Sequence, residues 1–249
     1  MVTILVTNDD GVHAPGLKAL SEAMQEVGRP VIIAPETNNS AISHALTMNR
    51  PLRVRKMEPD VYSIDGTPTD CVNLGIGKIL DEKPMLVVSG INHGGNLGDD
   101  VHYSGTVSAA IEGAMLGIPS FAVSMTGDGP FHFKTASHLA TELAKQILDK
   151  GLPRDTLLNV NVPNLPPDAA GEVRFTRQGR RVYEGAIKET FDPWGRKHFW
   201  IGGGTPYWDK GTDTDAAAIL DNCISITPIH LDLTNHEALK TLSEWRNFL

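Results

Sequence analysis

The sequence of 249 residues has only two cysteines, no apolar run long enough to cross a membrane and no basic segment at its start. Cys71 and Cys223 lie far apart and outside any zinc-binding spacing. This favours reduced thiols in a cytoplasmic protein, with a single bridge as the less favoured alternative. A bilayer requires about 20 consecutive apolar residues. Because polar Asn8, Asp9 and Asp10 follow the first apolar run at once, we do not expect a signal peptide.

The chain also has no excess of basic residues. The formal net charge is −8, with acidic and basic side chains mixed along the chain. Since a nucleic-acid polymer is bound mainly through Lys and Arg, this balance argues against an extended nucleic-acid surface. A small phosphorylated substrate stays compatible with the charge, because a bound metal supplies positive charge locally. The 41% hydrophobic and 21% charged residues are typical of a globular chain with a substantial core.

What the first part of the chain does contain is an alternation of short apolar runs and helical patterns. Four runs read as strands buried on both faces: residues 3–7, 31–34, 85–88 and 120–124. Helices are expected from Pro15, after Thr67 as N-cap with Asp70 three residues later, and over 106–116. This alternation predicts an α/β fold whose mostly parallel sheet has helices on both faces. The carboxyl ends of its strands should share one edge, where such sheets bind ligands.

The last part of the chain changes character. Residues 174–204 alternate polar, aromatic and basic side chains around Asp192-Pro193-Trp194-Gly195, which predicts a long β-hairpin. A hairpin cannot bury both of its faces alone, so we expect it to pack on a partner subunit. A strand at 224–227 and a helix capped by Thr234 follow. We interpret 1–249 as a single domain, with 1–170 as the core and 171–249 for oligomer contacts.

Two adjacent carboxylates, Asp9 and Asp10, directly follow the first strand. Taken alone, an Asp-Gly turn without a chemical role explains them equally well. At the ligand edge of a parallel sheet, however, two neighbouring negative charges repel each other. A divalent cation removes that repulsion, so their position there indicates a metal site.

Further polar loops are expected at the same edge. Ser40 lies in a loop after the second strand, for which a solvated loop is the plainer interpretation, and five glycines occur from Gly90 to Gly105. Glycine lets the backbone approach a ligand closely. The helix that opens at Ser104-Gly105-Thr106 offers free N–H groups to a phosphate. The loop is neither a Walker A motif nor a dinucleotide fingerprint.

Several motifs occur in order along the chain. They are Thr7-Asn8-Asp9-Asp10-Gly11, Ser40, Gly66-Thr67-Pro68-Thr69-Asp70-Cys71-Val72, Ser89-Gly90-Ile91-Asn92-His93-Gly94-Gly95-Asn96, and residues 102–110. Together they resemble the SurE (stationary-phase survival) nucleotidase family, and the likeness continues through 174–178 and 225–228. Any one of these motifs is weak by itself, whereas the ordered set is specific.

The resemblance implies a Rossmann-like core and a metal-dependent 5′-nucleotidase that hydrolyses nucleoside 5′-monophosphates. It leaves 3′-monophosphates and short polyphosphate open as further substrates, and it implies a homodimer or homotetramer. Carried over by position, the metal ligands fall on Asp9, Asp10, Ser40 and Asn92. All four offer oxygen, which suits one Mg²⁺ or Mn²⁺ per subunit. The positions that face the phosphate fall on Asn96, Ser104, Gly105 and Thr106.

The expected chemistry is in-line attack on phosphorus by a water that the metal activates, with Asp9 and Asp10 as ligands. The rival mechanism makes one aspartate the nucleophile. His44, His93 and His102 are candidates for the general acid, although a loop role is the plainer interpretation of each.

Two alternatives come from other functional classes. One is a nucleotide-binding module that does not hydrolyse its ligand. The other is an interaction protein in which Asp-Asp-Gly is only a turn. Four arginines cluster at the start of the predicted hairpin and favour a subunit contact over a role in guiding the substrate: Arg174, Arg177, Arg180 and Arg181.

Overall fold

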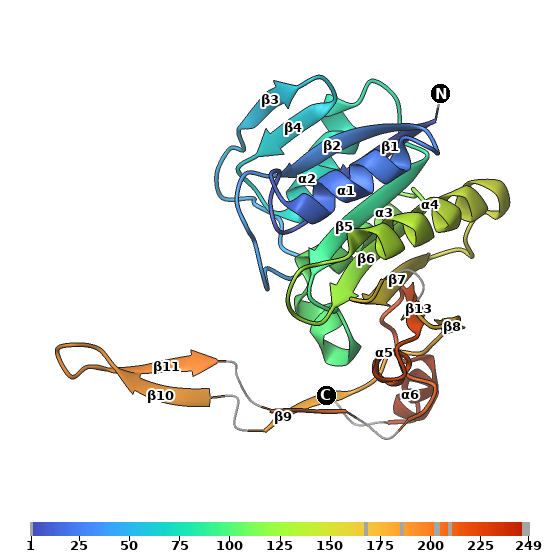
Figure 1. The fold of residues 1–249 in the computed structure, drawn as a ribbon. Coiled ribbons are helices and arrows are strands. Elements are labelled where there is room, and N and C mark those ends of the chain that lie inside the picture. The colour runs from blue at the N-terminus through green and yellow to red at the C-terminus, as the bar shows by residue number, and fades with distance from the viewer. Residues whose placement is uncertain (1, 167–168, 185–186, 202–204, 209–210, 246–249) are drawn as a thin grey trace.

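The computed structural model describes residues 2–166, 169–184, 187–201, 205–208 and 211–245 (Figure 1). Within these residues a nine-stranded sheet has the order β3-β4-β2-β1-β5-β6-β7-β13-β8. The strands that run parallel through its centre are β1 (Thr3–Thr7), β2 (Arg29–Pro35), β4 (Val61–Ile64), β5 (Leu86–His93), β6 (Ser120–Thr126) and β7 (Thr156–Pro163). The predicted, mostly parallel sheet is therefore present, and its strands end at one edge.

Helices cover both faces of this sheet. α1 (Pro15–Met24) and α4 (Phe133–Lys150) pack together on one face, while α2 (Pro68–Leu74) and α3 (Gly105–Met115) pack on the other. Successive residues of a strand serve opposite layers: Ile4 and Val6 belong to the cluster under α1, and Leu5 to the cluster under α2. This explains why the central strands read as unbroken apolar runs. None of the helices in the described ranges is both long and apolar enough to span a membrane.

Local signals set several element boundaries. Pro15 begins α1, and Thr67 forms a capping box with Asp70 at the start of α2, as predicted. The expected Thr234 cap is wrong, because the last helix, α6 (His236–Leu242), is capped by Asn235, whose side chain accepts from the Ala238 N–H at 2.8 Å. Asn and Thr are both competent cap residues, so the sequence alone did not decide between neighbours.

The remaining elements flank this core. β3 (Val54–Glu58) is antiparallel to β4, and β13 (Ile224–His230) is antiparallel to β7. A single turn of π-helix (Gly75–Ile79) follows α2, and a 3₁₀ segment, η2 (Gly98–Tyr103), precedes α3. The short helix α5 (Asp215–Leu220) contacts β13.

The predicted hairpin is an arm that projects from the body of the molecule (Figure 1). Its root pairs β9 (Arg181–Glu184) with β12 (Thr205–Trp208), and its tip pairs β10 (Ile187–Phe191) with β11 (Lys197–Ile201). The tip turn lies at Asp192–Gly195, as predicted, with Gly195 at φ 76°. The arm begins later than expected, because residues 173–175 form β8 on the open edge of β13 and thus belong to the main sheet.

Candidate active site

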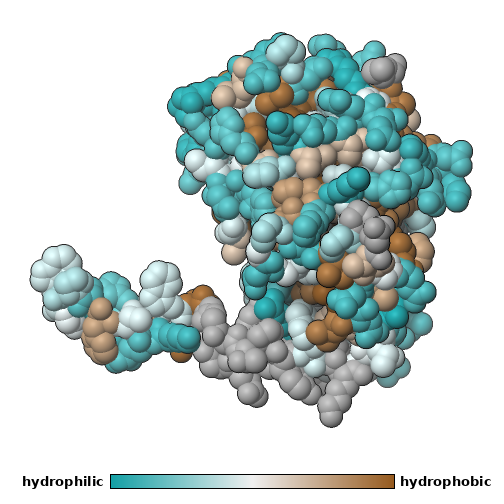
Figure 2. All heavy atoms as spheres, viewed as in Figure 1, coloured by the Kyte–Doolittle hydropathy of each residue, from teal (hydrophilic) through white to brown (hydrophobic). Residues whose placement is uncertain are grey.

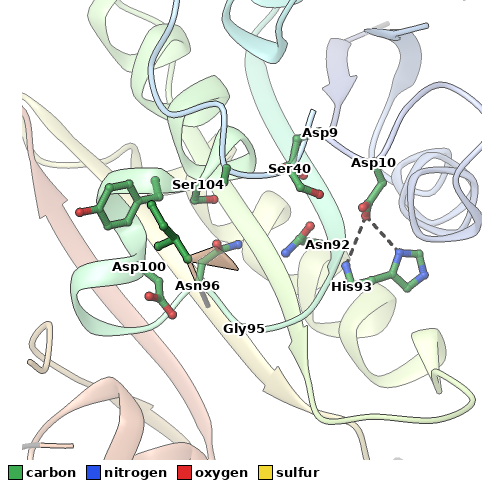
Figure 3. A pocket seen from close by; sticks show the side chains of 12 residues that line it. Asp9, Asp10, Ser40, Asn92, His93, Gly95, Asn96, Asp100 and Ser104 are labelled. Carbon is green, nitrogen blue, oxygen red and sulfur yellow. Dashed lines mark hydrogen bonds and ion pairs between the residues drawn. The ribbon is translucent and has the colours of Figure 1, made fainter. Parts of the chain in front are cut away.

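A cavity of about 520 Å³ opens at the carboxyl edge of the sheet. Figure 3 shows Asp9, Ser40 and Asn92 converging beside Asp10 in this cavity. Its lining comprises Asp9, Asp10, Ser40, Ala41, Asn92, His93, Gly95, Asn96, Asp100, Tyr103, Ser104 and Ile201. Segments far apart in the sequence thus meet at the edge where the parallel sheet predicted a ligand site.

Asp9 is held rigidly at the end of β1. Its side chain is only 6% exposed, and the Thr106 hydroxyl donates a hydrogen bond to its Oδ1. Burial raises the pKa of Asp9, and the neighbouring charge of Asp10 adds to that rise, while the Thr106 hydrogen bond opposes it. A buried carboxylate beside a second one is unfavourable by itself. It becomes favourable when a cation binds.

Asp10 points to a different set of partners. Its Oδ2 accepts from His93, at 3.0 Å from Nδ1 and 3.3 Å from the backbone nitrogen, and its Oδ1 accepts from the Asn38 amide at 3.3 Å. The His93 ring packs edge-on against Phe131 and Phe133, with centroids 4.8 Å and 5.4 Å away. His93 therefore has little freedom to turn, and it orients the Asp10 carboxylate.

Ser40 comes from the loop after β2. The Asn38 side chain accepts from both the Ser40 N–H at 2.8 Å and the Ser40 hydroxyl at 2.6 Å, which closes a tight turn. The Asn39 N–H donates to the Asp9 carbonyl at 2.7 Å, so this loop is tied to the end of β1. The turn places the Ser40 hydroxyl oxygen in the cavity beside the aspartates.

Asn92 lies near the end of β5, where the pairing with β6 shifts register between Ser89 and Asn92. Its amide nitrogen donates to the Gly94 carbonyl at 2.9 Å. The amide oxygen is consequently the end of this side chain that can serve a cation in the cavity.

The start of α3 closes the other side of the cavity. Ser104 is the N-cap, and its hydroxyl accepts from the Val107 N–H at 3.0 Å. Gly105 packs directly on Asp9, because an added Cβ would lie 2.8 Å from the Asp9 Cβ. Any larger residue would push the helix away from the carboxylate. The positive end of the α3 dipole therefore lies next to the aspartates.

Six of the eight predicted site residues line the cavity, and the other two support it. The lining residues among them are Asp9, Asp10, Ser40, Asn92, Asn96 and Ser104. Gly105 and Thr106 lie behind Asp9, and the Thr106 hydroxyl is used on Asp9 itself. Of the three histidines that are candidates for the general acid, His93 is the one among the described residues that line the cavity. His44 instead pairs with Glu112 at 2.7 Å.

The lining residues fit a hard divalent cation. Asp9, Asp10, Ser40 and Asn92 contribute carboxylate, hydroxyl and amide oxygens. Among the described residues no group of three or more His, Cys, Asp or Glu side chains forms a metal cluster. A cation at this edge would therefore have to combine the two carboxylates with neutral oxygen ligands.

The family model described as Survival protein SurE matches residues 4–185. The chain belongs to the SurE family. Relatives from several organisms carry the name 5′-nucleotidase SurE. The one from Geobacter sulfurreducens is 52% identical over 245 residues, covering 98% of this chain and 94% of that protein. The one from Methylococcus capsulatus is 50% identical over 242 residues, covering 97% and 96% respectively.

A solved structure extends the SurE likeness to three dimensions. The crystal structure of the SurE protein from Aquifex aeolicus matches with a TM-score of 0.88 at 45% identity, covering 97% of this chain and 98% of that one. This likeness confirms the α/β, Rossmann-like fold that the motifs implied. It also extends through the arm and the final strand, beyond the residues matched by the SurE family model.

The SurE motifs did not identify every residue of the cavity. Ala41, Asp100 and Ile201 line it from outside these motifs, whereas Tyr103 lies within the motif at 102–110. Asp100 forms an ion pair with Arg181 at the root of the arm, so one of the four arginines contacts the wall of the site. Asp100 and Tyr103 lie between Gly90 and Gly105, so the run of glycines already indicated that this segment approaches a ligand. Ile201 ends β11 on the arm, and only the three-dimensional path of the arm brings it to the cavity.

Proposed function

We propose that this chain is a metal-dependent 5′-nucleotidase, which hydrolyses nucleoside 5′-monophosphates to nucleoside and inorganic phosphate. The observation that carries the proposal is the meeting of Asp9, Asp10, Ser40 and Asn92 in one cavity beside the start of α3. The name shared by relatives that match almost the whole chain supports the same activity.

These four residues would hold one Mg²⁺ or Mn²⁺. When bound, such a cation supplies positive charge to phosphate oxygens and lowers the pKa of a water. The protein's own contribution is to fix the ligands. Thr106 holds Asp9, while His93 and Asn38 hold Asp10. Ligands fixed in advance do not have to reorganise during the reaction.

The phosphate would lie between the four ligands and the start of α3. Ser104 and Asn96 line this region of the cavity, and the Asn96 amide nitrogen has a second hydrogen beyond the one that it donates to Ser124. The backbone N–H groups of Gly105 and Thr106 belong to the first turn of α3, which has no intrahelical acceptor for them. Donors of this kind stabilise the negative charge on the non-bridging oxygens as the ester bond breaks.

The nucleophile in this proposal is water. Asp9 Oδ1 already accepts from the Thr106 hydroxyl, and its carboxylate packs against Gly105. Both contacts suit a fixed ligand better than a side chain that must move to attack phosphorus. If an aspartate were the nucleophile, rapid quenching with radiolabelled AMP would trap an acyl-phosphate on Asp9 or Asp10.

Release of inorganic phosphate from AMP in the presence of Mn²⁺ tests the activity directly, with Asp9→Asn as the blank. Tight AMP binding without phosphate release would instead support a non-hydrolytic binding module. The same assay with 3′-monophosphates and short polyphosphate defines the range of substrates. Parallel assays with Mg²⁺ and Mn²⁺ define the preferred ion.

The arm supports a homo-oligomer. Its apolar side chains are 60% to 88% exposed: Ile187, Phe191, Trp194, Phe199, Trp200 and Ile201. Figure 2 shows the arm standing clear of the body with hydrophobic residues on its surface. Clusters of this kind mark subunit contacts. In this proposal 1–170 forms the catalytic core and 171–249 the oligomer contacts of one cytoplasmic domain, as a homodimer or homotetramer.

A further inference from the structure

Two asparagines lie in the buried interior of β7. Asn159 and Asn161 are both fully buried and, being two residues apart, point to the same face of the sheet. Leu158, Val160 and Val162 occupy the opposite face, in the apolar cluster under α1 and α4. Burying an amide costs free energy unless it is hydrogen-bonded. Two such amides on one central strand therefore call for a specific partner.

That partner is the backbone of Asn96. The Asn161 Oδ1 accepts from the Asn96 N–H at 2.8 Å, and the Asn161 amide donates to the Asn96 carbonyl at 3.0 Å. The Asn159 amide donates to the same carbonyl at 2.8 Å. Asn161 thus binds both polar groups of one backbone residue, as a neighbouring strand would do, although residue 96 lies in a loop.

The side chain of Asn96 is fixed as well. Its amide donates to the Ser124 hydroxyl on β6 at 2.7 Å. The preceding Gly95 lies directly on β6, because an added Cβ would be 2.6 Å from the Thr126 methyl group. The amide nitrogen has two hydrogens, so one of them is still available to the cavity that Asn96 lines.

We propose that Asn161 is a positioning residue for phosphate binding, which acts by clamping the backbone of Asn96 from below the cavity. Asn161 is absent from the described cavity lining, so its effect must pass through the loop. Three of the four predicted metal ligands, Asp9, Asp10 and Ser40, lie on other segments. The fourth, Asn92, lies on β5 and is held by the Gly94 carbonyl, ahead of the clamped residue. The inference rests on the proposed function for the role of Asn96, and it adds a residue that the motifs did not indicate.

The test separates phosphate affinity from metal affinity. For Asn161→Leu, which keeps the number and branching of the side-chain heavy atoms but has no polar side-chain atom, we expect the Kd for inorganic phosphate on the Mn²⁺-loaded protein to rise about ten-fold. The Kd for Mn²⁺ alone, from calorimetry, should change by less than about two-fold. Ser225→Ala is the matched control, because Ser225 is a buried polar residue paired in register with Asn161 on β13. It should leave both constants unchanged.

A double-mutant cycle shows whether the effect passes through Asn96. In the Asn96→Ala background, Asn161→Leu should weaken phosphate binding by less than about two-fold, because the side chain it positions is gone. Equal effects in both backgrounds would overturn the proposal, and so would an unchanged phosphate Kd in Asn161→Leu. If Asn161→Leu does not fold, phosphate titration of the wild-type protein by NMR must shift the side-chain amide of Asn96, and an unmoved signal overturns the proposal.

A separate experiment tests the proposed function. Wild-type protein that releases no phosphate from AMP contradicts the nucleotidase activity. The phosphate Kd of the Asn161 variants is measured without turnover, so it still tests the clamp.

Discussion

The ligand edge of the sheet buries polar groups, whereas the projecting arm exposes apolar ones. At the ligand edge, polar groups are buried and held by other polar groups, as Asp9 is by Thr106 and Asn96 by Asn161. On the arm, large apolar side chains such as Trp200 and Ile201 are exposed to solvent, at 68% and 88%. The first arrangement brings the carboxylates of Asp9 and Asp10 together, and the second leaves apolar area in contact with solvent.

The two regions obtain their stability in different ways. The ligand edge is fixed by the fold, which holds the Asp9 and Asp10 carboxylates next to each other although their charges repel. The described residues of β10 and β11 pair with each other and belong to none of the apolar clusters of the core, so association would bury the apolar area that folding leaves exposed. Activity at the ligand edge should therefore respond to changes of charge. The oligomeric state, which depends on the arm, should respond to protein concentration.

The largest expected effect is on turnover. Asp9→Asn keeps the shape and the Thr106 contact but removes one negative charge from the predicted cation site. We expect phosphate release from AMP to fall about a thousand-fold or more at limiting Mn²⁺. Asp60→Asn is the control, since Asp60 is a half-buried carboxylate that pairs with Arg29 outside the cavity. Full turnover by Asp9→Asn would break the distinction between the two regions.

Removing the metal should act on the edge and spare the arm. EDTA should abolish phosphate release, and Mg²⁺ or Mn²⁺ should restore it. Added Mn²⁺ should also raise the melting temperature of the wild-type protein, because a ligand that binds only the folded state stabilises it. The oligomeric state, followed by sedimentation velocity, should be the same with and without EDTA. Dissociation on adding EDTA would show that the two regions are coupled.

The arm should respond to a change in apolar area. Trp200→Ser removes a side chain that is 68% exposed, so folding of the subunit should be nearly unaffected. We expect the dissociation constant of the oligomer to rise about ten-fold or more, because aromatic side chains dominate the binding energy of interfaces. Lys188→Ala pairs with Trp200→Ser as a polar control on the facing strand. Sedimentation equilibrium over a range of concentrations measures both, and a wild-type monomer at micromolar concentration would contradict the oligomer.

The sequence predicts the ligand edge better than the arm, for a physical reason. Strand periodicity and right-handed connections place Asp9, Ser40 and Asn92 at one edge whatever their rotamers. Capping chemistry is equally local, as at Thr67 and Asp70. These features depend on nearby residues or on the topology of the whole sheet, and both can be read from the chain.

Other parts of the site depend on side-chain direction and distant partners. The position of Thr106 near the phosphate stays a prediction, but its hydroxyl donates to Asp9, 97 residues away in sequence, which no local pattern indicates. The Asn161 clamp on Asn96 joins residues 65 positions apart. The pattern Asn-Val-Asn in a buried strand was a signal of a polar partner, but nothing local identifies that partner. Such contacts are fixed only when the strands are in register.

The smallest expected effect is on the free energy of unfolding, which is lowered when the buried Asp9 carboxylate is charged. Burial raises its folded-state pKa above the unfolded value, so the folded protein holds this proton more tightly. Stability that depends on the protonated form is lost as pH rises through the raised pKa, and it stays lost at neutral pH. Without metal at pH 7, Asp9→Asn should therefore be more stable than wild type, by about 1 kcal/mol.

The gain should depend on both pH and metal, which separates a charge effect from a packing effect. Below the unfolded pKa of Asp9 both proteins carry a neutral side chain there, so the difference in the free energy of unfolding should vanish. Saturating Mn²⁺ should reverse its sign, because only the wild type keeps both carboxylates for the cation. Chemical denaturation at pH 7, with EDTA and with Mn²⁺, measures this. A variant less stable than wild type in EDTA would mean that the Asp9 carboxylate serves the fold itself, and the contrast between a strained edge and an unstrained arm would be lost.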